Sequence, residues 1–310
     1  MPMTPAAATL ILAYDNPGHV RRLIGALDGL DIFLHCDAKT PDHVVTEMLG
    51  DRRDVSLVPR HSSPRRRWGA VEAELAGLRM VLERSPAEHI IVLSGSCYPL
   101  LTVSDLEDDL RAWRGISRLE LNPLPWAGWS NSSLIRDGGL HRVDRRFARI
   151  GGRLVLFAGY PIPIGRRAVP SDLRLQASSQ WKIFARRHAA ALLRVLDERA
   201  DLVRFWRSTY VPQESCLASI LASPGVVGSA SEQLRHEAAW YIDWRGSERG
   251  GHPRWLGLDD FPQLAAARNR RPLLRDDPLS HGPNTRNLFA RKMGPASTEL
   301  VTRIDEELRV

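Results

Sequence analysis

Two segments far apart in the chain hold side chains suited to acid–base and phosphate chemistry. Residues 209–214 end in Glu214, placed where a helix is expected to begin, and residues 288–292 end in Lys292. A carboxylate within hydrogen-bond reach of a hydroxyl group can take its proton. A cation placed in advance can stabilise a departing phosphate. The two segments therefore predict an enzyme that deprotonates a hydroxyl and neutralises a leaving phosphate without a metal ion.

The rarity of lysine draws further attention to the second segment. The chain has 43 basic residues, but only Lys39, Lys182 and Lys292 are lysines. A compact ammonium differs from a planar guanidinium in geometry and hydration, so a lysine among arginines can mark a site that needs it. Compositional bias is the alternative, and the count alone favours it. All three lysines nevertheless fall within or directly beside the short motifs described below.

Length and composition predict one catalytic domain with a large α/β core, because 43% of the 310 residues are hydrophobic. No run approaches the roughly 18 apolar residues that span a bilayer, and the first residues lack the pattern of a signal peptide. We therefore expect a cytoplasmic protein without a transmembrane segment. The three cysteines, Cys36, Cys97 and Cys216, have neither metal-ligand nor disulfide-framework spacing. Reduced, mostly buried thiols are expected.

The net charge of +7 leaves three classes of partner open: nucleic acid, an acidic membrane surface and an anionic small substrate. Arginines cluster at residues 65–67, 142–149 and 268–275. None of these clusters coincides with a known nucleic-acid-binding module. An anionic substrate such as a nucleotide sugar explains them equally well, and most of the arginines are expected to be solvated.

Hydrophobic periodicity predicts alternating strands and helices, which is typical of a mostly parallel sheet flanked by helices. Such sheets bind ligands at the carboxyl ends of their strands. Residues 123–170 lack this pattern, and their aromatic side chains favour packed or substrate-facing loops over an interdomain linker. The strands are expected at residues 9–14, 31–37, 55–58, 89–93, 178–184 and 238–244, and the helices at 20–27, 44–49, 70–83, 189–197, 213–221 and 297–310.

Several short motifs follow one another along most of the chain, at residues 10–27, 35–39, 67–69, 93–100, 179–181, 210–214 and 288–292. Each motif alone is weak, but their common order and spacing are fairly specific. Taken together, they resemble the motifs of glycosyltransferase family 14, the core-2/I-branching β-1,6-N-acetylglucosaminyltransferases and their peptide O-xylosyltransferase relatives.

The resemblance implies a single GT-A type domain over residues 1–310, with residues 1–120 binding the nucleotide sugar and residues 121–310 holding the acceptor and the catalytic groups. It also implies transfer with inversion from a UDP-sugar, most readily UDP-N-acetylglucosamine, with no metal or other cofactor. In agreement, the chain has no Asp-x-Asp motif. The acidic residues 105–109 follow Ser104, which we expect to be a helix N-cap, where carboxylates favour the helix dipole.

By similarity to the family, Glu214 is the catalytic base, and Lys292 and Arg254 bind the diphosphate. A glutamate at a helix start is the structural alternative for Glu214, and a solvated charge for Lys292. For Arg254, diphosphate binding and a purely structural role have equal weight. Arg291 or Arg271 would serve in its place.

The resemblance places Asp37, Trp68 and Ala13 at the nucleotide and Ser94 and Gly95 at the donor sugar. A carboxylate accepts hydrogen bonds from ribose hydroxyls or the uracil N–H, and an indole stacks on a base. For Trp68, ordinary packing against the following helix is an equally weighted alternative.

Glu120, Trp244 and Tyr241 match acceptor-side positions of the family approximately. Core packing is the alternative for the two aromatic residues, and it receives the larger weight.

Two departures from the family pattern affect the functional prediction. Gln213 and Cys97 stand where relatives commonly carry aspartate. A catalytically inactive protein that binds a sugar nucleotide or a glycan is therefore the alternative function, and nucleic-acid binding is a weaker one. The expected partners are a UDP-sugar and a carbohydrate or glycosylated small-molecule acceptor, with no nucleic acid. The arginine- and alanine-rich composition favours a bacterial enzyme.

Overall fold

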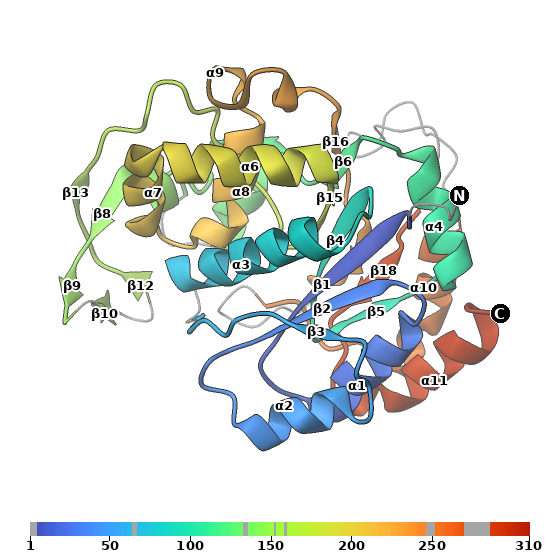
Figure 1. Cartoon of the computed structure of the whole chain (residues 1–310). Helices are drawn as coiled ribbons and strands as arrows, with labels where there is room; N and C mark the ends of the chain where they lie inside the picture. Colours follow the sequence, from blue (N-terminus) through green and yellow to red (C-terminus); the bar gives the residue numbers. More distant parts are fainter. Residues whose placement is uncertain are drawn as a thin grey trace.

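The computed structural model describes residues 5–63, 67–132, 136–151, 153–157, 160–245, 252–269 and 286–310. Within these residues, the largest sheet has seven strands in the order β16-β6-β15-β4-β1-β2-β3 (Figure 1). Four of its pairings are parallel, and the two made by β15 are antiparallel. The predicted mixed, mostly parallel α/β architecture is confirmed. The strands are β1 (Ala7–Ala13), β2 (Asp31–Cys36), β3 (Ser56–Leu57), β4 (His89–Ser94), β6 (Ser117–Leu119), β15 (Lys182–Ala185) and β16 (Leu234–His236).

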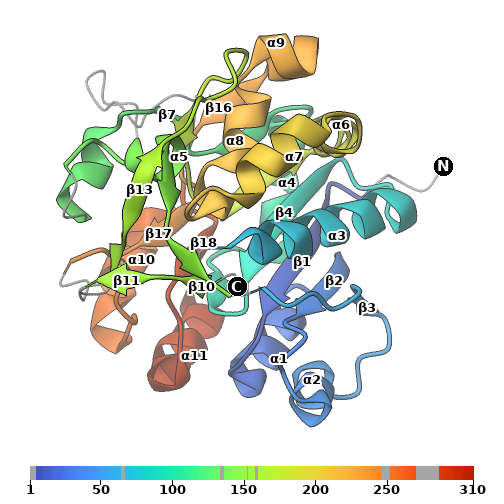
Figure 2. The same ribbon diagram turned by 90° about the vertical axis from the view of Figure 1, so that its left-hand side faces the viewer.

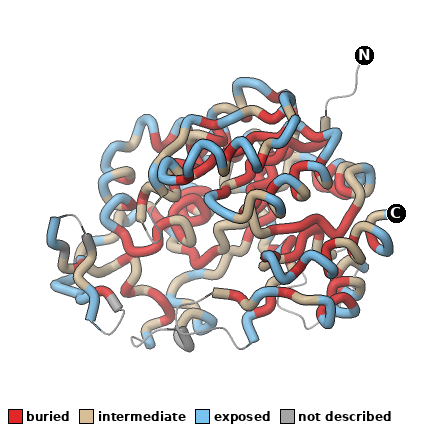
Figure 3. The backbone as a smooth tube through the Cα atoms, turned by 90° about the horizontal axis from the view of Figure 1, so that it is seen from below, coloured by how far each residue is buried: buried red, intermediate tan, exposed pale blue. Residues whose placement is uncertain are grey.

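The central strands are continuous apolar runs because helices cover both faces of the sheet. Figure 3 shows the buried interior enclosed by exposed helix surfaces. One face packs against α1 (Pro17–Ala26) and α11 (Thr298–Glu307), and the other against α3 (Trp68–Arg84), α6 (Arg186–Glu198) and α8 (Cys216–Leu221). Gly77 brings α3 close to the sheet, since a Cβ atom there would lie 2.3 Å from Leu10 Cδ1.

A smaller sheet pairs residues 289–291 with residues 97–99, which follow β4 in the chain. It has the order β17-β18-β5, with β5 (Cys97–Pro99) antiparallel to β18 (Phe289–Arg291), and β18 parallel to β17 (Trp240–Ile242). The segment before Lys292 therefore lies beside residues 97–99, although almost two hundred residues separate them in sequence. This pairing carries the predicted diphosphate-binding lysine to the predicted donor-sugar loop.

The described residues between 145 and 167 form an arm of short antiparallel strand pairs, at the left of Figure 1 and in the foreground of Figure 2. Part of the segment that lacked periodicity thus consists of short paired strands. The arm contains β8 (Arg145–Phe147), β9 (Arg149–Ile150), β10 (Arg153–Leu154), β11 (Leu156–Phe157), β12 (Tyr160–Pro161) and β13 (Pro163–Arg166).

The other described elements connect these layers. They are α2 (Asp42–Leu49), α4 (Val103–Ala112), β7 (Asn122–Pro123), η1 (Ala127–Ser132), α5 (His141–Asp144), β14 (Gln176–Ala177), α7 (Ala200–Arg207), η2 (Pro212–Glu214), α9 (Pro224–Val227), η3 (Gly228–Ser231), η4 (Leu258–Asp260), α10 (Phe261–Arg268) and η5 (Pro295–Ser297).

Two local predictions were wrong. The N-cap of α4 is Thr102, whose hydroxyl accepts a hydrogen bond from Asp105 N at 3.1 Å, so Ser104 lies inside the helix. The helix expected over residues 213–221 is divided into η2 and α8, because Ser215 adopts a non-helical conformation between them (φ −141°, ψ −39°). Glu214 is therefore the last residue of a 3₁₀ turn.

The structure explains the presence of one of the three lysines, Lys182. Lys182 Nζ lies 3.0 Å from Glu74 Oε1, and both side chains are almost fully buried between β15 and α3. An internal ion pair therefore accounts for this lysine.

The three cysteines are buried free thiols, as expected. In the described ranges, no helix combines the length and the apolar character needed to cross a membrane.

Candidate active site

The carboxyl ends of β1, β2 and β4 bring together the residues predicted to bind nucleotide and donor sugar. Asp37 N donates a hydrogen bond to Ala13 O at 3.0 Å, and Gly95 N donates to Leu12 O at 2.9 Å. A Cβ atom on Gly95 would lie 3.0 Å from both Ala13 Cβ and Val20 Cγ2. Glycine at position 95 thus permits close packing of this loop against β1 and α1.

Hydrogen bonds hold the Asp37 carboxylate at this edge. Oδ2 accepts from Ser63 N at 2.7 Å and from Ser63 Oγ at 2.6 Å, while Oδ1 accepts from Lys39 N at 2.8 Å. Partial burial alone would raise the pKa of Asp37, but these donors outweigh it, and the pKa lies below its ordinary value. The carboxylate is therefore ionised and oriented, as an acceptor for ribose or uracil donors requires.

Trp68 begins α3 and is only 8% exposed, in the cluster of apolar side chains between α3 and the sheet. Its Nε1 is buried and has no hydrogen-bond partner within the described part of the chain. This placement favours the packing alternative over stacking on a base.

The end of β18 places Arg291 against the donor-sugar loop. Its guanidinium donates hydrogen bonds to Ser94 Oγ and, at 2.8 Å, to Ser96 Oγ. It also lies over the Trp181 ring, with Cζ 4.5 Å from the ring centroid. Arg291, named in the sequence only as a substitute cation, therefore links this loop to the residues before β15.

Lys292 lies next to the same loop. Its Nζ is 3.7 Å from the centroid of the Trp255 ring, and its carbonyl accepts a hydrogen bond from Leu256 N at 2.9 Å. Met293 N donates to Ser96 O at 2.8 Å. These contacts fix the backbone after Lys292 beside Ser96 and hold the ammonium group over the Trp255 ring.

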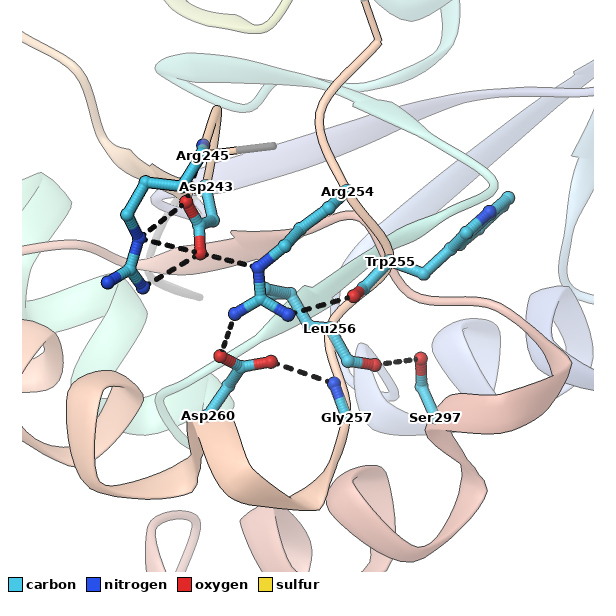
Figure 4. A network of polar contacts seen from close by, with 8 residues as sticks. All are labelled: Asp243, Arg245, Arg254, Trp255, Leu256, Gly257, Asp260 and Ser297. Atoms are coloured by element: carbon cyan, nitrogen blue, oxygen red, sulfur yellow. Dashed lines mark hydrogen bonds and ion pairs between the residues drawn. The ribbon is translucent and has the colours of Figure 1, made fainter. Parts of the chain in front are cut away.

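Arg254 occupies a different environment (Figure 4). Its guanidinium forms ion pairs with Asp260 and, at 2.6 Å, with the buried Asp243. Hydrogen bonds to Asp260 and then Asp243 raise the pKa of Arg254, and the pKa of Asp243 is lowered by Arg245 and Arg254. Two carboxylates thus compensate the charge of Arg254, which weakens its assignment to the diphosphate. Arg271 lies outside the described residues.

Glu214 is held by an arginine that the sequence identified only as a member of a basic cluster. Arg142 Nη1 lies 2.8 Å from Glu214 Oε2, and Arg142 Cζ lies 3.9 Å from the centroid of the Trp129 ring. The Glu214 side chain remains 37% exposed, so it is open to solvent or an acceptor. Arg142 belongs to the cluster at residues 142–149, and its contact with Glu214 depends on long-range folding.

The turn before Glu214 has an uncommon backbone. Val211 has φ 56° and ψ 51°, a left-handed conformation that β-branched residues rarely adopt. Such conformations cost about 1–3 kcal/mol and cluster at functional sites. The strained turn supports the assignment of Glu214 to a site.

Glu120 is brought close to Glu214, and the two carboxylates interact. Burial, and then the negative charge of Glu214, raise the pKa of Glu120 to about 7. A carboxyl group with a raised pKa beside a second carboxyl group suits a site that transfers protons. Sequence similarity had suggested Glu120 only as an acceptor-binding residue.

Stability should depend on pH through Glu120. The carboxyl group keeps its proton in the folded protein up to about pH 7, whereas in the unfolded chain it loses the proton near the ordinary glutamate pKa of 4.5. The stabilisation is therefore complete below about pH 4.5 and is lost as the pH rises through about 7. As the pH rises from about 5 to about 8, we expect the Tm of the wild type to fall relative to the Tm of Glu120→Gln, as measured by thermal unfolding. An unchanged difference in Tm would contradict the shifted pKa.

The acceptor-side aromatic residues differ in environment. Trp244 is 55% exposed, so the weight given to core packing was wrong for this residue. Tyr241 on β17 is partly buried, and burial, followed by the charge of Asp243, raises its pKa. An exposed indole is free to contact a sugar ring.

Hydrogen bonds and a cation–ring contact connect the turn at Glu214 with the loop at Ser94. Ser178 N donates to Glu214 O at 2.8 Å, and Trp181 N donates to Ser179 Oγ at 3.2 Å. Because Arg291 lies on Trp181, residues 178–181 join the Glu214 turn to the donor-sugar loop. Among the described residues, no three His, Cys, Asp or Glu side chains are grouped as metal ligands, and metal independence remains a prediction.

Comparison with solved structures gives distant likenesses. Mouse xyloside xylosyltransferase 1 is 10% identical, over 92% of this chain and 97% of that protein, with a TM-score of 0.39. A mannosyltransferase from Pyrobaculum calidifontis, in complex with GDP-mannose and Mn²⁺, is 11% identical over 74% of each chain, with a TM-score of 0.29. A putative glucose-1-phosphate thymidylyltransferase from Bacillus anthracis is 11% identical, over 60% of this chain and 74% of that protein, with a TM-score of 0.30. At these scores the likenesses carry no argument about function.

The family model called Branch, for Core-2/I-branching enzyme, matches residues 31–265. No curated protein matches significantly. The matched range makes up most of the chain and includes Asp37, Glu120, Glu214 and Arg254, while Lys292 lies beyond it. The chain belongs to the Core-2/I-branching enzyme family of glycosyltransferases, with a GT-A type α/β fold.

Proposed function

We propose that this glycosyltransferase moves a sugar, most readily N-acetylglucosamine, from a UDP-sugar to a hydroxyl group of a glycan or small molecule, with inversion and without a metal ion. The main support for this proposal is that a chain of contacts joins a candidate base to two candidate phosphate-binding cations. Glu214, partly exposed and held by Arg142, is connected through residues 178–181 to the loop at Ser94 and to the cations at the end of β18.

In this proposal, Glu214 accepts the proton of the acceptor hydroxyl as its oxygen forms a bond to the anomeric carbon. The bond from that carbon to the diphosphate breaks on the opposite face, and UDP leaves with the electron pair. Lys292 stabilises the negative charge that develops on the diphosphate. Arg291 positions the donor-sugar loop through Ser94 and Ser96.

The direct test is a thermal-shift and hydrolysis screen of the purified protein against nucleotide sugars, with and without EDTA. Stabilisation by UDP and hydrolysis of one UDP-sugar, unchanged by EDTA, are expected. Loss of activity in EDTA with recovery on adding a divalent cation would overturn metal independence. Binding of UDP without turnover on any acceptor would favour an inactive binding protein, the alternative that Gln213 and Cys97 suggest.

Replacement of Lys292 should weaken both donor binding and turnover. In Lys292→Ala the leaving diphosphate loses its nearest proposed cation, so we expect kcat/KM to fall about 100-fold, with a rise in the Kd for UDP. Both quantities are measured by donor-hydrolysis kinetics and calorimetry. Arg303→Ala is a matched control, because Arg303 also places its charge over an aromatic ring, that of Phe261, but on α11. Equal activity of the two variants would contradict the assignment of Lys292.

A further inference from the structure

The arm formed by residues 145–167 concentrates positive charge. It contains six arginines and no aspartate or glutamate, in a chain whose net charge is +7. Arg146 and Arg166 are exposed on the paired strands β8 and β13. Arg167 has a different role, because it donates hydrogen bonds to Val143 O at 2.6 Å and to Phe205 O at 2.9 Å. These hydrogen bonds attach the end of the arm at Arg167 to α5 and α7.

The same arm exposes large apolar side chains. Phe157 is 77% exposed, Ile150 76%, Ile164 66% and Leu156 53%. Several large apolar side chains exposed within one short segment point to an interaction site, whereas single ones are normal on a protein surface. Because they follow one another within a short, projecting segment, they indicate a contact surface for a partner outside the chain (Figures 1 and 2).

We propose that this arm docks on the surface of a bilayer containing anionic lipids. Arginines near such a surface are attracted to the lipid headgroups, and apolar side chains enter the boundary between headgroups and acyl chains. A second copy of the arm fits less well, because two surfaces that each expose Arg146 and Arg166, on a segment without carboxylates, repel each other. A nucleic acid also fits less well, since base stacking requires aromatic side chains and, with Ile162 included, four of the five exposed large apolar side chains described on the arm are aliphatic.

The base of the arm lies beside the candidate active site. Phe147 packs on Tyr210, with ring centroids 5.4 Å apart, and Tyr210 N donates to Arg142 O at 3.1 Å. Arg142 in turn holds Glu214. Docking through the arm would therefore bring Glu214 near the lipid surface, where a lipid-linked acceptor would present its hydroxyl group. Membrane docking itself does not depend on the proposed chemistry.

The test measures co-sedimentation of the full chain with vesicles of phosphatidylcholine alone or with about 30% phosphatidylglycerol. We expect at least about tenfold tighter binding to the anionic vesicles, weakened when the salt concentration is raised from about 0.1 M to about 0.5 M. Arg146→Ser/Arg166→Ser and Ile150→Ser/Phe157→Ser/Ile164→Ser should each weaken binding about tenfold or more.

Matched controls carry the same substitutions elsewhere on the surface. Arg84→Ser/Arg194→Ser removes two exposed helix arginines, and Leu57→Ser/Val310→Ser removes exposed apolar side chains. Both controls should bind like the wild type. Donor hydrolysis in solution should be the same in the arm variants and the wild type, which separates this test from that of the proposed function.

Three results would overturn the proposal. The first is the absence of vesicle binding, or binding that the arm variants leave unchanged. The second is a dimer, seen by analytical ultracentrifugation, that the apolar variant dissociates while vesicles are not bound. The third is salt-dependent RNA binding that the arginine variant loses, again without vesicle binding.

Discussion

Glu214→Gln should reduce sugar transfer by about a thousandfold while leaving the Kd for UDP unchanged. A positioned general base contributes about 10²- to 10⁴-fold to the rate, and glutamine cannot accept the acceptor's proton. Glutamine keeps the size of the side chain and an oxygen that can accept the hydrogen bond from Arg142. The loss should therefore appear in kcat, measured with saturating donor and acceptor, and binding of UDP should be unaffected.

Glu72→Gln provides a closely matched control. Glu72 is also 37% exposed and also paired with an arginine, with Oε1 3.0 Å from Arg207 Nη2. It begins the second turn of α3 and has no proposed part in transfer. Full activity of Glu214→Gln, or equal losses in both variants, would refute the assignment of the base. Because the charge of Glu214 raises the pKa of Glu120, Glu214→Gln should also lower that pKa.

Lys182→Met should be the most destabilising of the substitutions considered, costing about 3–5 kcal/mol in the free energy of unfolding near pH 8. The substitution leaves the Glu74 carboxylate buried without its counter-charge. Its Oε2 already has no hydrogen-bond partner within the described ranges. Denaturant unfolding of the variant and the wild type measures the difference.

The pH dependence of this loss separates charge from packing. Burial raises the pKa of Glu74, and Lys182 opposes that rise. Without Lys182 the carboxyl group should take up a proton, so the loss should be smaller at pH 5 than at pH 8.

Two further variants test the ion pair. Glu74→Gln/Lys182→Met removes both charges and should cost less than Lys182→Met alone. Arg207→Met breaks the exposed pair with Glu72 and should cost less than about 1 kcal/mol. A loss in Lys182→Met no larger than in Arg207→Met, or one independent of pH, would show that the buried pair does not contribute as proposed.

The amino-acid sequence by itself determined the α/β class and the position of most major elements. Strands such as β1, β2 and β4 are short apolar runs, and α3 and α6 have helical spacing of apolar residues, so local patterns suffice to identify them. Order along the chain also placed Asp37 and Ser94 at the carboxyl ends of two strands of the parallel part of the sheet, β2 and β4, which flank β1 and where a ligand site is expected. The motifs likewise indicated the family, which the family model confirms.

Only the tertiary structure decided the partners of the charged groups. Arg142 meets Glu214 across 72 positions of sequence, and Lys182 meets Glu74 across 108. Arg254 is compensated by Asp243 and Asp260, which a motif comparison could not reveal. Hydrophobic pattern and turn chemistry act over a few residues, whereas the ionisation of a side chain depends on the burial and charges that folding brings around it. The sequence therefore identified the candidate groups, and the fold determined which of them are placed and charged for chemistry.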